Sequence, residues 1–342
     1  MPISPFSKRN INVIMLALGP LTLFMGYLIG AFTGGADTVR VFAWNALLVE
    51  LLVIYLPSRR FMELHGGHEA FGLVKIKPVE WAWALLLGIG MFFISTALSG
   101  TMRLVYEALN FKAADFSQAV FPGSGWRFYA SLLLIAVIPA FAEETLFRGA
   151  LLFSWLPGGV KAALINSSLL FALVHLQPVE LPSIFFMGLM MGAVTLVCGS
   201  NLPAMAMHGA NNAIALLLMR FADDATAAGA DLDAKTLLPV LLVYAAIGGL
   251  GSFASFRGLR AAAARRLEKS PKELALKNAQ ALVHLAAIAP SPVGAKPPEI
   301  RRRAALSGKA AVVLTYIVLL LLNGLMLLAM VLDIPGLELL KS

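Results

Sequence analysis

Three short polar patterns lie in stretches of the chain that are otherwise strongly apolar. They contain Glu143, Glu144 and Arg148; Phe171 and His175; and His208 and Asn212. An ionisable side chain at the centre of a bilayer costs roughly 2.5–3.5 kcal/mol on insertion scales, so such residues are usually functional. A carboxylate with an imidazole can take a proton from water, and a second imidazole with an amide can donate hydrogen bonds to an oxyanion. The residue types therefore predict hydrolysis.

Helical spacing separates the two adjacent glutamates. Glu144 and Arg148 are at i and i+4, so they share a helix face and can pair, which lowers the cost of burying both. Glu143 is rotated by about 100° from Glu144 and can point into a cavity between helices. We predict a structural Glu144–Arg148 pair and a catalytic Glu143, whose enclosure between helices would favour its role as a base.

The two histidine patterns have the same i, i+4 spacing. Phe171 can shield one side of the His175 imidazole, and His208 and Asn212 can present two hydrogen-bonding groups in one direction. Each pattern alone also has a structural explanation, because polar side chains can simply bridge membrane helices. All three patterns in one chain favour a site, since a purely structural account leaves at least four costly side chains without a role.

Other hydrolase signatures are absent from the sequence. It contains no His-Glu-x-x-His run of a zinc protease, and the glycine-rich tract 122–125 lacks the spacing of a nucleophile elbow. His65 and His68 flank two glycines and are interpreted as a loop feature. Glu50 and Asn45 lie in an apolar stretch and can line a cavity, but no partner for them is recognisable.

The composition indicates an integral membrane protein. Of 342 residues, 59% are hydrophobic and only 13% are charged, against about 25% charged in soluble proteins. Cys198 is the only cysteine, which excludes an intramolecular disulfide and a cysteine-rich metal site. Residues 257–309 hold 12 of the 27 Lys and Arg and 3 of the 19 Asp and Glu. This single basic block favours a loop beside anionic lipid over a nucleic-acid partner.

Apolar runs long enough to cross the bilayer recur along the whole chain. We expect nine spans, near 11–33, 41–57, 79–100, 128–156, 160–176, 181–199, 203–221, 236–256 and 310–332. The fold class is therefore all-α, a polytopic transmembrane bundle with an eight-span core and a ninth C-terminal span. Positive charges at Lys8 and Arg9, in the loop after the second span, and from Arg257 onward place the N-terminus in the cytoplasm.

The span 128–156 is unusual because it contains Pro139 and the first polar pattern. At the rise of an α-helix it would be about 43 Å long, so it must tilt, bend or protrude. Counting residues from the expected boundaries places Glu143 and His208 nearer the cytoplasmic side and His175 nearer the outside. A joint site requires these side chains to converge.

The ordered set Glu-Glu-x-x-x-Arg, Phe-x-x-x-His and His-x-x-x-Asn resembles the CPBP (Abi) family of CAAX prenyl endoprotease-like intramembrane proteases. The resemblance covers about residues 128–215 and includes the connecting stretches 185–192 and 199–204. It implies the following roles: Glu143 activates water with help from His175, His208 and Asn212 stabilise the oxyanion, and Glu144 and Arg148 complete the first motif. We expect N-terminal spans at 1–127, a catalytic core at 128–256, a basic cytoplasmic loop at 257–309, and a C-terminal span and tail at 310–342.

The resemblance implies an intramembrane endopeptidase that cuts a membrane-associated peptide or protein on the cytoplasmic side. No cofactor is favoured; a zinc-dependent version remains an alternative, since two His and a Glu can hold zinc with a water, although Asn212 suits oxyanion binding better. Two further alternatives are a non-catalytic immunity or interaction protein and a transporter, for which the expected inverted repeat is not visible. Whether the substrate is prenylated is left open.

Overall fold

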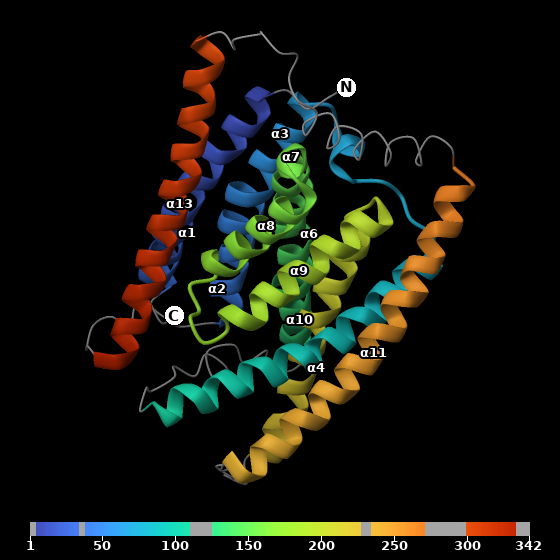
Figure 1. Cartoon of the computed structure of the whole chain (residues 1–342). Helices are drawn as coiled ribbons and strands as arrows, with labels where there is room; N and C mark the ends of the chain where they lie inside the picture. Colours follow the sequence, from blue (N-terminus) through green and yellow to red (C-terminus); the bar gives the residue numbers. More distant parts are fainter. Residues whose placement is uncertain (1–4, 34–37, 110–124, 227–233, 271–298, 333–342) are drawn as a thin grey trace.

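The computed structural model describes residues 5–33, 38–109, 125–226, 234–270 and 299–332 (Figure 1). Within these ranges the secondary structure is helical and contains no strand. The predicted all-α fold class is confirmed.

The helices fall into an N-terminal group and a larger group that follows it. The N-terminal group is α1 (Pro5–Thr33), α2 (Thr38–Trp44), η1 (Asn45–Tyr55), α3 (Leu56–Leu64), η2 (His68–Phe71) and α4 (Pro78–Ala108). The second group begins with α5 (Trp126–Ser131), η4 (Leu132–Val137), α6 (Ile138–Glu144), η5 (Thr145–Leu151), α7 (Leu152–Trp155) and η6 (Leu156–Gly158). It continues with α8 (Val160–Val174), α9 (Leu181–Cys198), α10 (Leu202–Thr226), α11 (Ala234–Glu268) and α13 (Glu299–Leu332).

Helices or apolar helical stretches occupy all nine positions expected for spans. Within the described ranges, six helices are long and apolar enough to cross a membrane: Val39–Leu64, Pro78–Ala108, Trp126–Gly158, Leu181–Cys198, Leu202–Arg220 and Thr236–Glu268. The apolar stretches Ile14–Gly26, Val160–Val174 and Ala310–Leu325 are shorter. The chain is therefore a multi-pass membrane protein, while the count of nine spans and the cytoplasmic N-terminus stay predictions.

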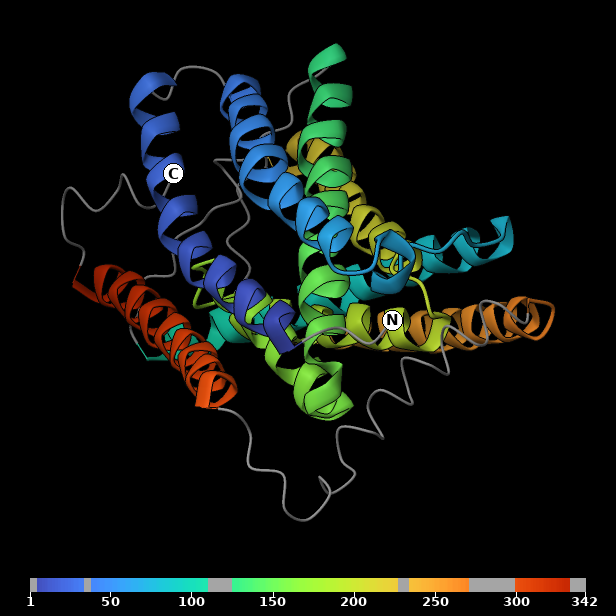
Figure 2. The ribbon, with the colours of Figure 1, turned by 90° about the horizontal axis from the view of Figure 1, so that it is seen from above.

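The helices form two flanks around a central group. On one flank α1 lies beside α13, and on the other α11 runs along α4 (Figures 1 and 2). Glycine permits close approach of α4 to its neighbours: a Cβ added to Gly88 would lie 2.3 Å from the Met207 carbonyl oxygen of α10. A Cβ on Gly248 of α11 would lie 2.7 Å from the Gly90 carbonyl oxygen. These small residues let backbones pack where lipid provides no hydrophobic force.

A buried ion pair joins the ends of α4 and α11. Arg266 donates to Glu80 Oε1 at 2.9 Å and to the Cys198 carbonyl at 2.6 Å, and Glu80 is fully buried.

Helix α11 continues to Glu268, twelve residues beyond the end of the expected span at 256. The predicted basic loop 257–309 therefore begins and ends in helix, and its residues 271–298 lie outside the described residues.

The long helix at 126–158 departs from α-helical winding in two π-helical segments and in a final 3-10 turn. The π-helical segments η4 and η5 flank α6, and α6 contains Pro139 in its first turn. The change lies next to the proline, which has no N–H for an α-helical bond and commonly distorts a helix. The polar residues of the first pattern follow directly, at the end of α6 and in η5.

Candidate active site

Four elements bring the predicted site residues to the centre of the bundle. The two glutamates end α6, Arg148 lies in η5, and His175 directly follows the last residue of α8. His208 and Asn212 lie in α10. Helix α6 packs against α10 and η5, and η5 packs against α8, so Glu144 and His208, 64 positions apart, become neighbours.

Glu144 holds two basic side chains. Its Oε1 accepts a hydrogen bond from Arg148 Nη1 at 2.6 Å and lies 3.1 Å from Nδ1 of His208. The predicted Glu144–Arg148 pair is therefore present, and both side chains are fully buried. Arg148 also donates to the Gly188 carbonyl at 3.2 Å, which ties the pair to α9. The His208 contact was not predicted, because nothing local in the sequence relates positions 144 and 208.

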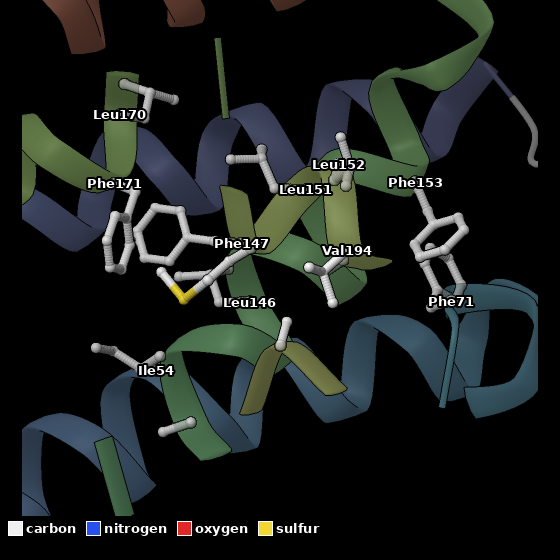
Figure 3. Close-up of a cluster of buried hydrophobic side chains, with 14 of the residues drawn as sticks. Ile54, Phe71, Leu146, Phe147, Leu151, Leu152, Phe153, Leu170, Phe171 and Val194 are labelled. Atoms are coloured by element: carbon white, nitrogen blue, oxygen red, sulfur yellow. The ribbon is translucent and has the colours of Figure 1, made fainter. Parts of the chain in front are cut away.

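Phe171 is the apolar centre of the site. The Arg148 guanidinium lies 4.2 Å from its ring centroid, a cation–π arrangement. The ring centroids of His175, His208 and Phe147 lie 4.7, 5.9 and 5.2 Å away. Figure 3 shows the Phe147 and Phe171 rings side by side at one end of the buried cluster. Both imidazoles thus contact one phenylalanine, and the predicted shielding of His175 is present.

Glu143 faces His175, as the hydrolytic interpretation requires. Oε2 of Glu143 lies 4.0 Å from Nε2 of His175, with 14% and 27% of the side chains exposed. Nδ1 of His175 lies 2.6 Å from the Phe171 carbonyl oxygen. Because that oxygen can only accept, Nδ1 carries a hydrogen, and Nε2 is the ring nitrogen that faces Glu143.

The expected boundaries placed His175 nearer the outside than Glu143, and this relative depth was wrong. Nε2 of His175 and Oε2 of Glu143 lie 4.0 Å apart, so the two side chains are at the same depth. Helix α8 has 15 residues, about 22 Å of helix, which is shorter than the ~30 Å hydrocarbon core.

A cavity opens in front of Glu143 and His175. Its volume is about 170 Å³. It is lined by Met15, Thr22, Asn45, Val49, Glu50, Ile54, Glu143, Leu146, Phe147, Val174 and His175. The wall opposite the predicted pair comes from α1 and η1, and Glu50 in that wall is only 5% exposed. The signal for Glu50 in the sequence was an acid within an apolar span, but no motif assigned it a partner.

Asn212 is engaged with the helix that carries Pro139. Its Nδ2 donates to the Ile135 carbonyl at 3.2 Å, and its Oδ1 accepts from Asn211 at 3.2 Å. Pro139, four residues after Ile135, cannot give that carbonyl the usual α-helical bond. Neither His208 nor Asn212 is among the described residues that line the cavity. The structure thus brings both near the glutamates' helix but not into the cavity wall.

The described residues offer a poor fit to a zinc site. Among them, no three His, Cys, Asp or Glu side chains are grouped so that they could hold a metal ion. Glu143 and His175 supply two donors, whereas a catalytic zinc takes three protein ligands. Zinc dependence stays a hypothesis, and no step below involves a metal.

A comparison with known protein families matches the part of the chain that contains the predicted site residues. Residues 125–214 match the family model described as type II CAAX prenyl endopeptidase, Rce1-like. The match includes all six predicted site residues and confirms the resemblance to the CAAX protease-like family. No curated protein and no solved structure matches the chain.

Proposed function

Because residues 125–214 match the CAAX protease-like family, we propose that the chain is an intramembrane endopeptidase that uses a glutamate-activated water. Its substrate is a membrane-associated peptide or protein, cut on the cytoplasmic side of the bilayer. The observation that carries the proposal is the Glu143–His175 pair at the cavity, with Oε2 and Nε2 4.0 Å apart.

This separation suits an activated water. With a neutral His175, Nε2 and the Glu143 carboxylate oxygen are both acceptors and cannot bond to each other directly. At 4.0 Å apart they can be bridged by one water that donates to both. Such a water donates one hydrogen to Glu143 and the other to His175, and its lone pair is free to attack a carbonyl carbon. As the C–O bond forms, Glu143 takes the proton, and the peptide carbonyl becomes an oxyanion.

His208 and Asn212 are proposed to stabilise that oxyanion. If Nδ1 of His208 donates to Glu144, Nε2 can donate only when the ring is protonated, so the donor is an imidazolium paired with Glu144. Asn212 has two amide hydrogens and uses one for Ile135. The other remains for the substrate, which must reach past the cavity wall toward α10.

Collapse of the intermediate completes the reaction. The C–N bond breaks, the oxyanion reforms a carbonyl, and Glu143 returns its proton to the leaving amine. The products are a carboxylic acid and an amine, and Glu143 and His175 regain their starting states.

The test uses the purified full chain in liposomes with two fluorescence-quenched peptides. One ends in a prenylated Cys-aliphatic-aliphatic-X sequence, and the other has the same sequence without the lipid. We expect cleavage by wild type and a roughly 10²–10⁴-fold lower rate for Glu143→Gln. The matched control is Glu63→Gln, which removes an exposed carboxylate from the end of the helix Val39–Leu64.

The outcomes separate the mechanisms. Cleavage by Glu143→Gln at the wild-type rate would eliminate Glu143 as the base. A loss of activity with a zinc chelator that zinc restores would assign the chemistry to a metal instead. Preference for the prenylated peptide would identify the lipid as part of the recognised substrate.

A further inference from the structure

Glu50 is a buried acid that the six-residue motif set does not include. It lies in η1, outside residues 125–214, and is 5% exposed. It lines the same cavity as Glu143 and His175. A buried carboxyl in an apolar span is costly, and in membrane proteins such groups mark functional sites.

The surroundings of Glu50 offset little of the cost of burying its carboxyl group. Among the described residues, its Oε2 has no hydrogen-bond partner, and the same holds for Oε2 of Glu143. The rest of the lining is mainly apolar, including Val49, Ile54 and Leu146. Because the two carboxyls line the same cavity, ionisation of one disfavours ionisation of the other. Two carboxyls that share one apolar cavity cannot both ionise cheaply.

The neighbouring charges do not neutralise a second carboxylate. Of the described cavity-lining residues, Glu50, Glu143 and His175 are the ionisable ones. Arg148 interacts electrostatically with Glu143 but is hydrogen-bonded to Glu144. In the proposed mechanism His208 is protonated, so Glu144, Arg148 and His208 together carry one net positive charge, which balances one further carboxylate and not two.

We propose that Glu50 is a positioning residue that keeps its proton and donates it in a hydrogen bond to Glu143 across the cavity. This inference rests on the proposed function. The pair then carries one negative charge, located on Glu143, and the inner cluster as a whole is neutral. One oxygen of Glu143 accepts from Glu50, and the other faces the water that His175 also binds.

Glu50 is not consumed in the reaction. The proton that Glu143 takes from water returns to the leaving amine, and the Glu50 proton stays in its hydrogen bond throughout. Its effect is on geometry and charge: it fixes the Glu143 carboxylate and prevents a second negative charge from entering the cavity. The N-terminal helices therefore complete the site of the matched region.

Infrared spectroscopy of the full chain in liposomes tests the proton directly, without any substrate. A protonated carboxylic acid has a carbonyl stretching band that an ionised carboxylate lacks. At neutral pH, where a solvated glutamate is ionised, the wild-type minus Glu50→Gln difference spectrum should contain this band. The wild-type minus Glu63→Gln spectrum should lack it. Absence of the band in the first difference would overturn the proposal.

The Glu143→Gln variant tests the partner of that proton. Glu50 keeps its carboxyl in this variant, but its acceptor changes from a carboxylate to an amide. The Glu50 band should therefore shift in frequency. An unshifted band would show that Glu50 does not donate to Glu143.

Cleavage of the quenched peptides tests the positioning role. Glu50→Gln retains a donor toward Glu143 and should keep the wild-type rate within about threefold. Glu50→Leu removes the donor and should lower the rate by roughly tenfold or more, since small misplacements of reacting groups are costly. Equal rates for the Gln and Leu variants would contradict positioning. Failure of the proposed function would appear differently, as no cleavage by wild type with the infrared band intact.

Discussion

The same isosteric change, Glu to Gln, should affect different properties at the two adjacent glutamates: activity at Glu143 and stability at Glu144. Glu143 has an unpartnered Oε2 among the described residues and a side chain 14% exposed at a cavity. Replacing it with Gln removes a charge that has no direct ion-pair contact shorter than 4.0 Å. We expect Glu143→Gln to lose activity and to cost much less stability than Glu144→Gln.

Glu144→Gln should instead destabilise the fold. The change leaves Arg148, which is fully buried, without its anion, and it weakens the contact with His208 at 3.1 Å. Removing one member of a buried ion pair typically costs about 3–5 kcal/mol, because the remaining charge is uncompensated. A loss of this size lowers an unfolding midpoint by on the order of 5–10 °C.

Thermal unfolding of the purified variants in detergent, followed by intrinsic fluorescence, measures the difference. Glu63→Gln again provides the control for loss of one carboxylate at the surface. An unfolding midpoint of Glu144→Gln equal to that of wild type would refute the assignment of Glu144 as the anchor of Arg148. A large fall for Glu143→Gln would refute the separation of the two roles.

Two further predictions concern the helices that frame the site. Gly88→Ala should lower stability by about 1–3 kcal/mol, because its Cβ would lie 2.3 Å from the Met207 carbonyl oxygen. The control is Gly251→Ala, whose new Cβ has no atom of the described residues within 4 Å. Equal unfolding midpoints for the two variants would contradict close packing at Gly88. Arg266→Met should cost about 3–5 kcal/mol by leaving the fully buried Glu80 unpaired. The double change with Glu80→Leu should recover most of that loss, and a double variant no more stable than Arg266→Met alone would count against the pair.

Contacts set by local helical geometry were predictable from the sequence. The pairs Glu144–Arg148 and Phe171–His175 each span four residues, and both are in contact. The helix positions were also predictable, because the thickness of the bilayer sets the length of an apolar run that can cross it. These features depend on a rise and a turn that any helix shares.

Contacts between helices were not predictable in this way. Glu144 and His208 are 64 residues apart, and their contact depends on how α6 and α10 pack. The predicted depth of His175 relative to Glu143 was wrong, because counting residues from the expected span boundaries does not show how far one helix is shifted along another. Glu50 could be recognised as costly but not assigned to Glu143, since residues on α1 and η1 form the cavity only after the bundle assembles.

In the proposed mechanism, Asn212 combines a structural contact with the role of an oxyanion donor. Pro139 distorts the helix that carries both glutamates and leaves the Ile135 carbonyl without its usual donor, and an amide hydrogen of Asn212 supplies a bond at 3.2 Å. That bond fixes the amide, so its second hydrogen has a defined direction. An oxyanion donor needs such a fixed orientation, because stabilisation depends on dipoles arranged before the charge develops. The proline that bends the glutamate helix therefore also provides the contact that orients the proposed oxyanion donor.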